Sequence, residues 1–166
     1  MAQGYEDYLA QNPLCTFSIF TGVQVNHLSD IAVEIRYNLD RGVQEKGIDY
    51  PTFNRFYALF WLWVLGAFEV TRTMHEGRVC FSKPVQDELK QLKKRLATIR
   101  SPFAKQKSVD PDVLFRTENS ISGTDSARKD YCFTIGGEQI WARSLIDEFE
   151  RVMRSIRGED VLSQYR

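Results

Sequence analysis

One run of thirteen uncharged residues constrains the fold of this chain more than any other segment. The run, FYALFWLWVLGAF, extends from Phe56 to Phe68, includes six aromatic residues and lies between Arg55 and Glu69. A membrane-spanning helix needs about 20 mostly apolar residues, so this run is too short to cross a bilayer. Its apolar residues occupy every side of a helix, which is typical of a helix surrounded by protein. We therefore expect the central helix of a soluble bundle.

Sequence signals at both ends predict the bounds of this central helix. Asp49, Tyr50 and Pro51 mark its start, because proline suits the first helical turn, where its missing N–H is not needed. Gly77 marks its end. A helix over that span would contain about 26 residues and be roughly 39 Å long. Such a helix would form the spine of the domain.

Three further segments predict amphipathic helices. Apolar residues recur at spacings of three and four from Val25 to Leu39, from Val85 to Phe103 and from Leu145 to Ile156. This period is typical of a helix with one buried face. Gly42 predicts the end of the first of these helices. Pro102 predicts a stop or a kink near the end of the second, because proline lacks a backbone N–H and restricts the residue before it.

The remaining segments predict a long loop and a β-hairpin. Residues 108–130 are rich in Asp, Ser, Thr and Gly and show no sustained period, which is typical of a loop or connector. Residues 131–141 alternate bulky with smaller side chains around Gly136 and Gly137, which permit the positive backbone angles of a two-residue turn. The chain beyond Gly158 is expected to fray.

These segments together predict a mainly α fold, an antiparallel four-helix-type bundle with a small β-hairpin before the last helix. The length of 166 residues fits one globular domain. Its expected parts are an N-terminal extension (1–22), a three-helix core (23–107), a loop (108–130), the hairpin (131–141) and a C-terminal helix (142–158).

Composition excludes several classes of protein. Basic and acidic residues are equal in number, at 22 each, so any binding of nucleic acid must be local. Acidic residues near the N-terminus are unlike a secretory signal and predict a cytoplasmic protein that does not enter the membrane. Cys15, Cys80 and Cys132 are widely separated, which predicts reduced, packed thiols. With two histidines and no Cys-x-x-Cys, we expect neither a metal site nor a cofactor.

Basic residues cluster in the third predicted helix and just after it. No acidic residue lies between Glu88 and Asp110. Arg100 falls beside the apolar face, so it needs a carboxylate, carbonyl or phosphate partner. Two interpretations stay open: a solvated face with Arg100 paired to a carboxylate such as Glu69, or a surface that binds RNA or another polyanion. The candidate phosphate-binding residues are Lys90, Lys93, Lys94, Lys105 and Lys107; Arg95 belongs to the same basic cluster.

A candidate polar cleft lies where the central helix stops being apolar. Glu69, Arg72 and His75 follow at spacings of three and therefore share a face. Arg100 would join them if the second and third helices are antiparallel. A histidine there could transfer protons near neutral pH. The alternative is an intrahelical pair between Glu69 and Arg72, with His75 facing solvent.

Two segments, WVLGAFEVTRTM and LKKRLATIRSPFAKQ, resemble the HEPN superfamily of helical domains found in bacterial toxins and defence systems. The resemblance covers roughly residues 23–107. It implies a homodimer. Members with ribonuclease activity carry a motif of an Arg, usually a polar residue after it, and a His four to six residues further on. With this motif they cut RNA without a metal. Arg100 and Ser101 match the first half of that motif. The histidine is missing, because residues 105–107 are Lys, Gln and Lys.

The missing histidine decides which function the resemblance implies. Loss of a proton-transfer group typically costs about 10²–10⁴-fold in rate. We therefore expect a binding or regulatory module without an assigned catalytic residue, a homodimer that contacts RNA or a protein partner through Arg100 and Lys105. One alternative is a divergent metal-independent endoribonuclease that uses Arg100 with Lys105 or His75. Another is a small-molecule sensor with a pocket among aromatic residues that include Trp61, Trp63 and Trp141.

Overall fold

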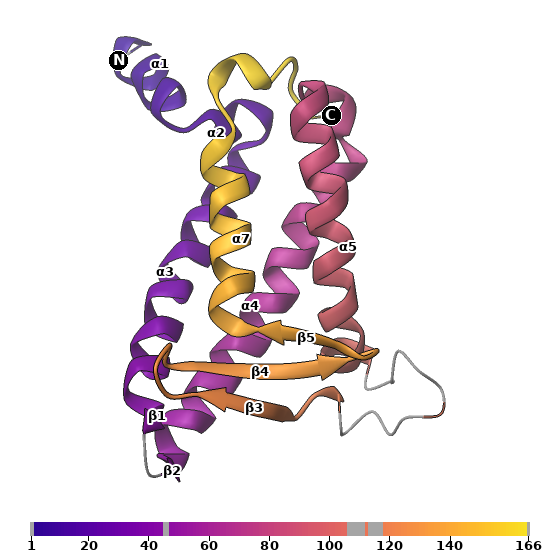
Figure 1. Ribbon diagram of the computed structural model, residues 1–166. Helices are drawn as coiled ribbons and strands as arrows, with labels where there is room; N and C mark the ends of the chain where they lie inside the picture. Colours follow the sequence, from indigo (N-terminus) through magenta and orange to yellow (C-terminus); the bar gives the residue numbers. More distant parts are fainter. Residues whose placement is uncertain (1, 45–46, 106–111, 113–117, 166) are drawn as a thin grey trace.

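Four long helices and a three-stranded sheet organise the computed structural model of this chain (Figure 1). The structure describes residues 2–44, 47–105, 112 and 118–165. Among these residues, the long helices are α3 (Ile19–Gly42), α4 (Tyr50–Glu76), α5 (Lys83–Lys105) and α7 (Ala142–Ser155). The predicted mainly α fold, with a hairpin before the last helix, is confirmed.

Shorter elements join and flank the long helices. Two short helices, α1 (Ala2–Gln11) and α2 (Pro13–Phe17), precede α3. The 3-10 turns are η1 (Arg78–Cys80) and η2 (Gly158–Asp160). The strands are β1 (Val43–Gln44), β2 (Gly47–Ile48), β3 (Ile121–Asp125), β4 (Asp130–Ile135) and β5 (Glu138–Trp141).

Helix α4 begins and ends where the sequence predicts. The Asp49 side chain caps its N-terminus by accepting from the backbone N–H of Thr52, and Pro51 occupies the first turn. Gly77 follows its last residue, so the helix has 27 residues. No described helix combines the length and the apolar character that crossing a membrane requires.

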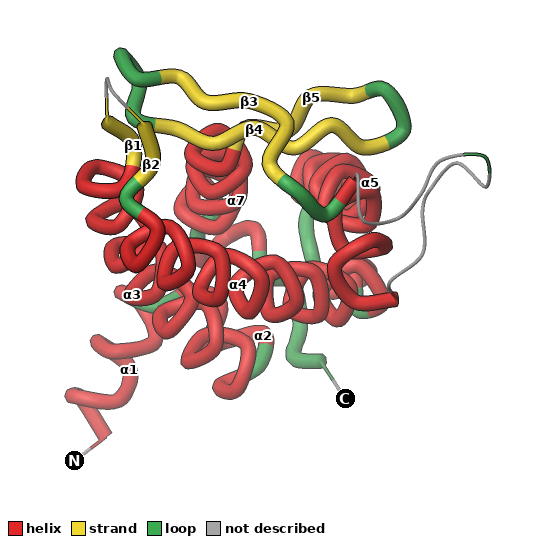
Figure 2. Tube along the Cα trace, turned by 90° about the horizontal axis from the view of Figure 1, so that it is seen from below, coloured by secondary structure: helices red, strands yellow, loops and turns green. Residues whose placement is uncertain are grey.

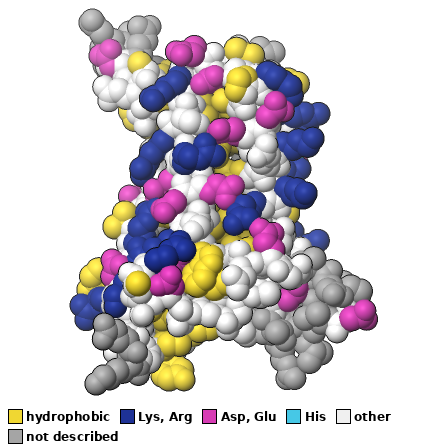
Figure 3. Space-filling model, viewed as in Figure 1, with side chains coloured by type: hydrophobic (Ala, Val, Ile, Leu, Met, Phe, Trp, Pro, Cys, Tyr) yellow, Lys and Arg dark blue, Asp and Glu magenta, His cyan; other side chains and the backbone are white. Residues whose placement is uncertain are grey.

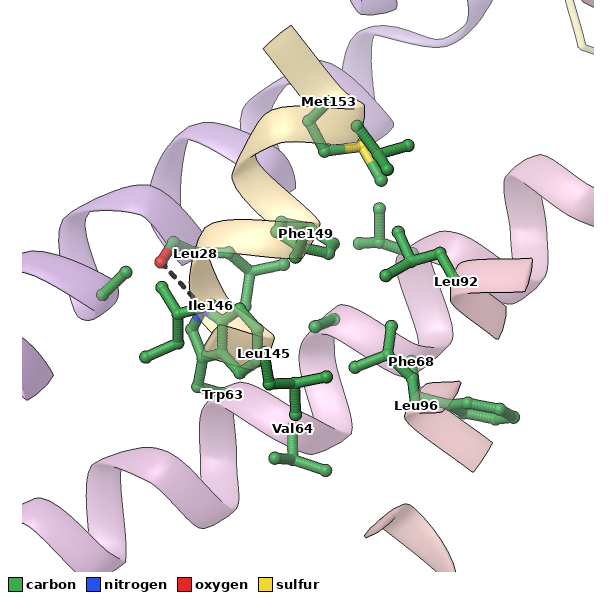
Figure 4. Packing of buried hydrophobic residues seen from close by; sticks show 14 of the residues in the cluster. Leu28, Trp63, Val64, Phe68, Leu92, Leu96, Leu145, Ile146, Phe149 and Met153 are labelled. Carbon is green, nitrogen blue, oxygen red and sulfur yellow. Dashed lines mark hydrogen bonds between the residues drawn. The ribbon is translucent and has the colours of Figure 1, made fainter. Parts of the chain in front are cut away.

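The core lies on the face of α4 that packs toward α3, α5 and α7 (Figures 2 and 4). Trp63 is fully buried at its centre, and its indole N–H donates to the backbone oxygen of Leu28 at 3.1 Å. The ring of Phe149 on α7 meets the Trp63 ring edge-on, with 5.4 Å between centroids. Leu92 and Leu96 close this core from α5. The aromatic run is therefore the spine of the bundle, as predicted, but protein does not surround it, because Trp61 and Leu62 are 38% and 52% exposed.

The sheet lies across one end of the bundle and is larger than the predicted hairpin (Figure 1). β4 and β5 form that hairpin, with Ile135 opposite Glu138, and Gly136 and Gly137 have φ of 57° and 80° in the turn. β3 adds a third antiparallel strand on the other edge of β4, where the sequence predicts a loop. Because β4 is almost wholly buried, its free edge needs hydrogen-bond partners, and β3 supplies them.

Asp130, the first residue of β4, joins the sheet to α7. Its side chain is fully buried, and Oδ1 accepts from the backbone N–H of Tyr131 at 2.9 Å and of Arg143 at 3.1 Å. The carboxylate therefore caps the first turn of α7 from outside that helix. Oδ2 has no hydrogen-bond partner among the described residues, and Arg128 Nη2 lies 4.0 Å from it. Burial raises the pKa of the Asp130 carboxyl.

Two helix bounds differ from the expected ones. Helix α3 begins at Ile19, inside the expected N-terminal extension, because the Ser18 side chain caps it by accepting from the N–H of Thr21. Helix α5 continues through Pro102 to Lys105 instead of stopping. Pro102 lies in the last turn, where it removes only one helical hydrogen bond, and Phe103 gains contacts with the rings of three residues: Tyr57, Phe60 and Phe133.

The chain after α7 is ordered against the bundle, so the prediction of a frayed tail is wrong. Helix α7 ends at Ser155, and η2 follows. The N–H of Leu162 donates to the oxygen of Cys80 at 2.8 Å, and the N–H of Tyr165 donates to the oxygen of Phe17 at 2.9 Å. The Tyr165 ring lies 5.1 Å from the Phe17 ring. These contacts attach the tail to η1 and to α2.

Candidate functional site

The predicted site residues lie along the line where α4 and α5 face each other, which we call the α4/α5 seam. Three contacts define it. Trp61 Nε1 donates to the Phe103 oxygen at 3.0 Å, Arg100 Nη2 lies 3.6 Å from Glu69 Oε1, and Lys93 Nζ lies 3.3 Å from His75 Nδ1. The α4 numbers rise while the α5 numbers fall, so the helices are antiparallel. The expected arrival of Arg100 beside Glu69 follows from this arrangement.

Carboxylates in or beside the seam neutralise Arg100 and Arg72. The Arg100 guanidinium lies over the Phe68 ring, 4.7 Å from its centroid, in addition to its contact with Glu69. Arg72 pairs with Glu69 at 2.8 Å and with Glu76 at 2.6 Å. The expected intrahelical pair between Glu69 and Arg72 is therefore present. This part of the predicted polar cleft is close to neutral.

His75 has a different environment from either alternative that the sequence suggests. It is half-buried, and its Nδ1 faces the Lys93 ammonium. Desolvation lowers the pKa of His75, and the positive charges of Lys93, Arg78 and Lys90 lower it further, while Glu76 opposes them. The lowered pKa favours the neutral imidazole, in which an unprotonated Nδ1 accepts a hydrogen bond from the Lys93 ammonium.

The positive charges of Lys93, Arg78 and Lys90 act on His75, and Lys94 follows Lys93 on α5. We call these four residues the cationic patch. None of them pairs with an acidic side chain among the residues the structure describes. Arg95 differs, because it pairs with Glu138 on β5 and with Glu148 on α7. Figure 3 shows Lys and Arg side chains along the edge of the molecule that α5 forms.

The other candidate lysines lie at the far end of α5. Lys105 is exposed at its last turn. Lys107 lies outside the described residues. Trp61 lies at the same end of the seam and is 38% exposed. Fourteen helical positions separate Trp61 from His75, which corresponds to about 21 Å along α4.

Sequence reasoning missed Arg78 and the contribution of Trp61 to this surface. Arg78 follows Gly77 in the short link between α4 and α5. The shortness of this link was the signal, because it keeps a cation there close to the first turns of α5. Trp61 was grouped with Trp63 and Trp141 in a hypothetical ligand pocket. The three lie in different surroundings, because Trp63 is buried in the core and Trp141 lies under the Arg128 guanidinium at 5.5 Å.

The described residues hold no group of three His, Cys, Asp or Glu side chains arranged to bind a metal. Cys15, Cys80 and Cys132 are all buried and free, as packed thiols. No family model, curated protein or solved structure matched this chain. The resemblance to the HEPN superfamily therefore stays a prediction.

Proposed function

We propose that this protein is a module that binds the phosphate backbone of RNA through the cationic patch. The observation that supports it most is that Arg78, Lys90, Lys93 and Lys94 have no acidic partner among the described residues, although acidic and basic residues are equal in number. Elsewhere on the bundle, cations such as Arg36 and Arg55 pair with carboxylates. Lys and Arg side chains without a carboxylate partner can instead neutralise the phosphates of a nucleic acid, which releases counterions to the solvent.

The exposed ring of Trp61 favours unpaired nucleotides. It lies at the opposite end of the seam from the cationic patch, beside exposed Lys105. Proteins that bind single strands combine a positive groove with aromatic side chains on which bases stack, each worth about 1–3 kcal/mol. A strand that follows the seam would place phosphates at the patch and a base on Trp61.

A titration with a fluorescent single-stranded RNA tests this proposal. Four cations predict a slope of log affinity against log salt of about −3, so a rise from about 50 to 200 mM salt weakens binding roughly 50-fold. Neutralising the three α5 lysines, as K90Q/K93Q/K94Q, reduces affinity strongly at low salt.

The matched control removes three charges elsewhere, as R41Q/R151Q/R157Q, and leaves affinity within about threefold of the wild type, because long-range effects are screened. The absence of any association at low salt rejects the proposal. An equal loss in the control shows that net charge, and not the patch, carries the binding.

A second candidate function is a divergent metal-independent endoribonuclease, and the neutral imidazole of His75 favours it. Arg100 and Lys93 are seven positions apart on α5, about 10 Å, so the structure brings His75 to Lys93 rather than to Arg100. Cleavage of RNA in the presence of EDTA, lost in H75Q but kept in R100Q, is expected if His75 transfers protons. Equal cleavage by the wild type and H75Q points to a contaminating nuclease.

The rest of the proposal comes from the resemblance and the composition. A homodimer, a link to bacterial defence or toxin systems, and a place in the cytoplasm are proposed together with the RNA-binding role. A protein partner at the cationic patch would need an acidic surface, and the titration separates it from RNA.

A further inference from the structure

A groove of about 340 Å³ lies between α3 and α4, and no residue of α5 or α7 lines it. Its lining combines apolar residues with polar ones: Leu28, Ile31, Leu62, Gly66 and Val70 are apolar, and Gln24, His27, Glu69, Arg72 and Thr73 are polar or charged. Gly66 allows the helices to approach closely there, since a Cβ at this position would lie 2.9 Å from Leu28. The groove is thus a largely apolar depression on the outside of the bundle, and it shares Glu69 and Arg72 with the α4/α5 seam.

Exposed apolar residues stand at the two ends of this groove. Leu62 lines it and is 52% exposed. Phe20 is 79% exposed and lies one turn before Gln24, on the same stripe of α3 as the lining residue His27. Leu28 lies against Gly66 and Glu34 pairs with Arg55, so α3 and α4 are antiparallel, and Phe20 and Leu62 are about 18 Å apart along the groove.

This arrangement is complementary to itself under a two-fold rotation. An axis perpendicular to the groove at its midpoint exchanges the two ends, so Phe20 of one copy falls on Leu62 of the other. Each Phe20 ring then enters the apolar depression of the opposite copy. An isologous interface requires this pairing of one patch with itself.

The size of the surface fits a dimer. Helix α3 has 24 residues, about 36 Å in length, and two adjacent helices are about 20 Å wide. The face is therefore roughly 700 Å², close to the 800 Å² or so that each partner buries in a standard interface. The ion pair of Glu34 and Arg55 lies at one end as a polar rim.

We infer that the α3/α4 groove is the interface between two copies of this chain, with Phe20 of each copy seated beside Leu62 of the other. This inference rests on the homodimer part of the proposed function. It is independent of RNA binding, because Phe20 and Leu62 lie outside the cationic patch.

Light scattering coupled to size-exclusion chromatography tests the interface. At about 100 µM, the wild type is expected to elute as a dimer, and F20E and L62E as monomers, since each places a charge in the apolar contact. V33E is the control, because Val33 is 66% exposed on α3 and does not line the groove. It stays dimeric. Unchanged circular dichroism confirms that the monomeric variants are folded.

Oxidative cross-linking tests the geometry. The native cysteines are buried, so the double variant F20C/L62C is expected to form a covalent dimer, whereas F20C alone does not. A monomeric wild type, a dimer that persists in both F20E and L62E, or equal cross-linking of F20C alone overturns the inference. RNA titration of the monomeric variants tests the RNA-binding proposal separately, so failure of the dimer interface and failure of RNA binding give different results.

Discussion

Two tryptophans only two positions apart on α4 are expected to lose different properties on truncation, because Trp63 is buried and Trp61 is exposed. Trp63 is fully buried and hydrogen-bonded to the oxygen of Leu28. Replacing it by alanine removes its packing and leaves a cavity, at a cost of about 3–5 kcal/mol. With about 2.1 cal/mol/K of unfolding entropy per residue, the 166 residues give roughly 350 cal/mol/K. W63A should therefore lower Tm by about 9–14 °C.

Trp61 opens to solvent, so its truncation leaves no enclosed cavity. It is 38% exposed, and about 60% of the 1.5–3 kcal/mol typical of a fully buried apolar side chain is roughly 1–2 kcal/mol. W61A should lower Tm by about 3–6 °C. If a base stacks on this ring, the same variant loses about 1–3 kcal/mol of RNA affinity, which is roughly 5–150-fold.

Differential scanning calorimetry and the RNA titration, both carried out on the two variants, separate these effects. W63A, measured well below its Tm, should bind RNA as the wild type does. A larger Tm loss in W61A than in W63A contradicts the burial of the two rings. Unchanged RNA affinity in W61A removes the stacking contact from the proposal.

Three more predictions concern charged groups. Burial raises the pKa of Asp130, so the folded state favours the protonated carboxyl. The contribution of Asp130 to the free energy of unfolding therefore falls as pH rises above about 3.8. D130N should abolish this pH dependence, measured by urea unfolding at several pH values. The pKa of His75 is lowered, so its contribution is lost as pH falls below about 6.5; NMR should find its midpoint below that value and higher in K93Q. Glu150 is buried and pairs with Arg36, so E150A should cost about 1.5–3 kcal/mol by urea unfolding.

Much of the helical part of the fold could be predicted because its signals are local. Asp49, Pro51 and Gly77 each act on backbone groups within one turn, so the bounds of α4 follow from sequence alone. Strand β3 could not be predicted this way, because ISGTD has neither apolar alternation nor β-branched runs. It is a strand because the buried β4 leaves an edge to be paired, which is a property of the assembled sheet.

The same distinction applies to the candidate site. The contact of Arg72 with Glu69 depends on spacing along one helix and was predictable. The contact of His75 with Lys93 depends on the register between two helices, which periodicity does not determine. A stop or a kink was predicted at Pro102, and the stop is wrong, because the packing of Phe103 on Tyr57 outweighs one lost hydrogen bond.

The contact between Tyr165 and Phe17 forms only after nearly the whole chain has been synthesised. The two residues are 148 positions apart, since 165 − 17 = 148, and ribosomes add about 5–20 residues each second. Helix α2 therefore waits roughly 7–30 s for its last neighbour. During that interval Phe17 and the end of α4 lack the cover that Tyr165 provides. A released chain that ends before Tyr165 should consequently be more accessible to chaperones and proteases at this end of the bundle than at the sheet.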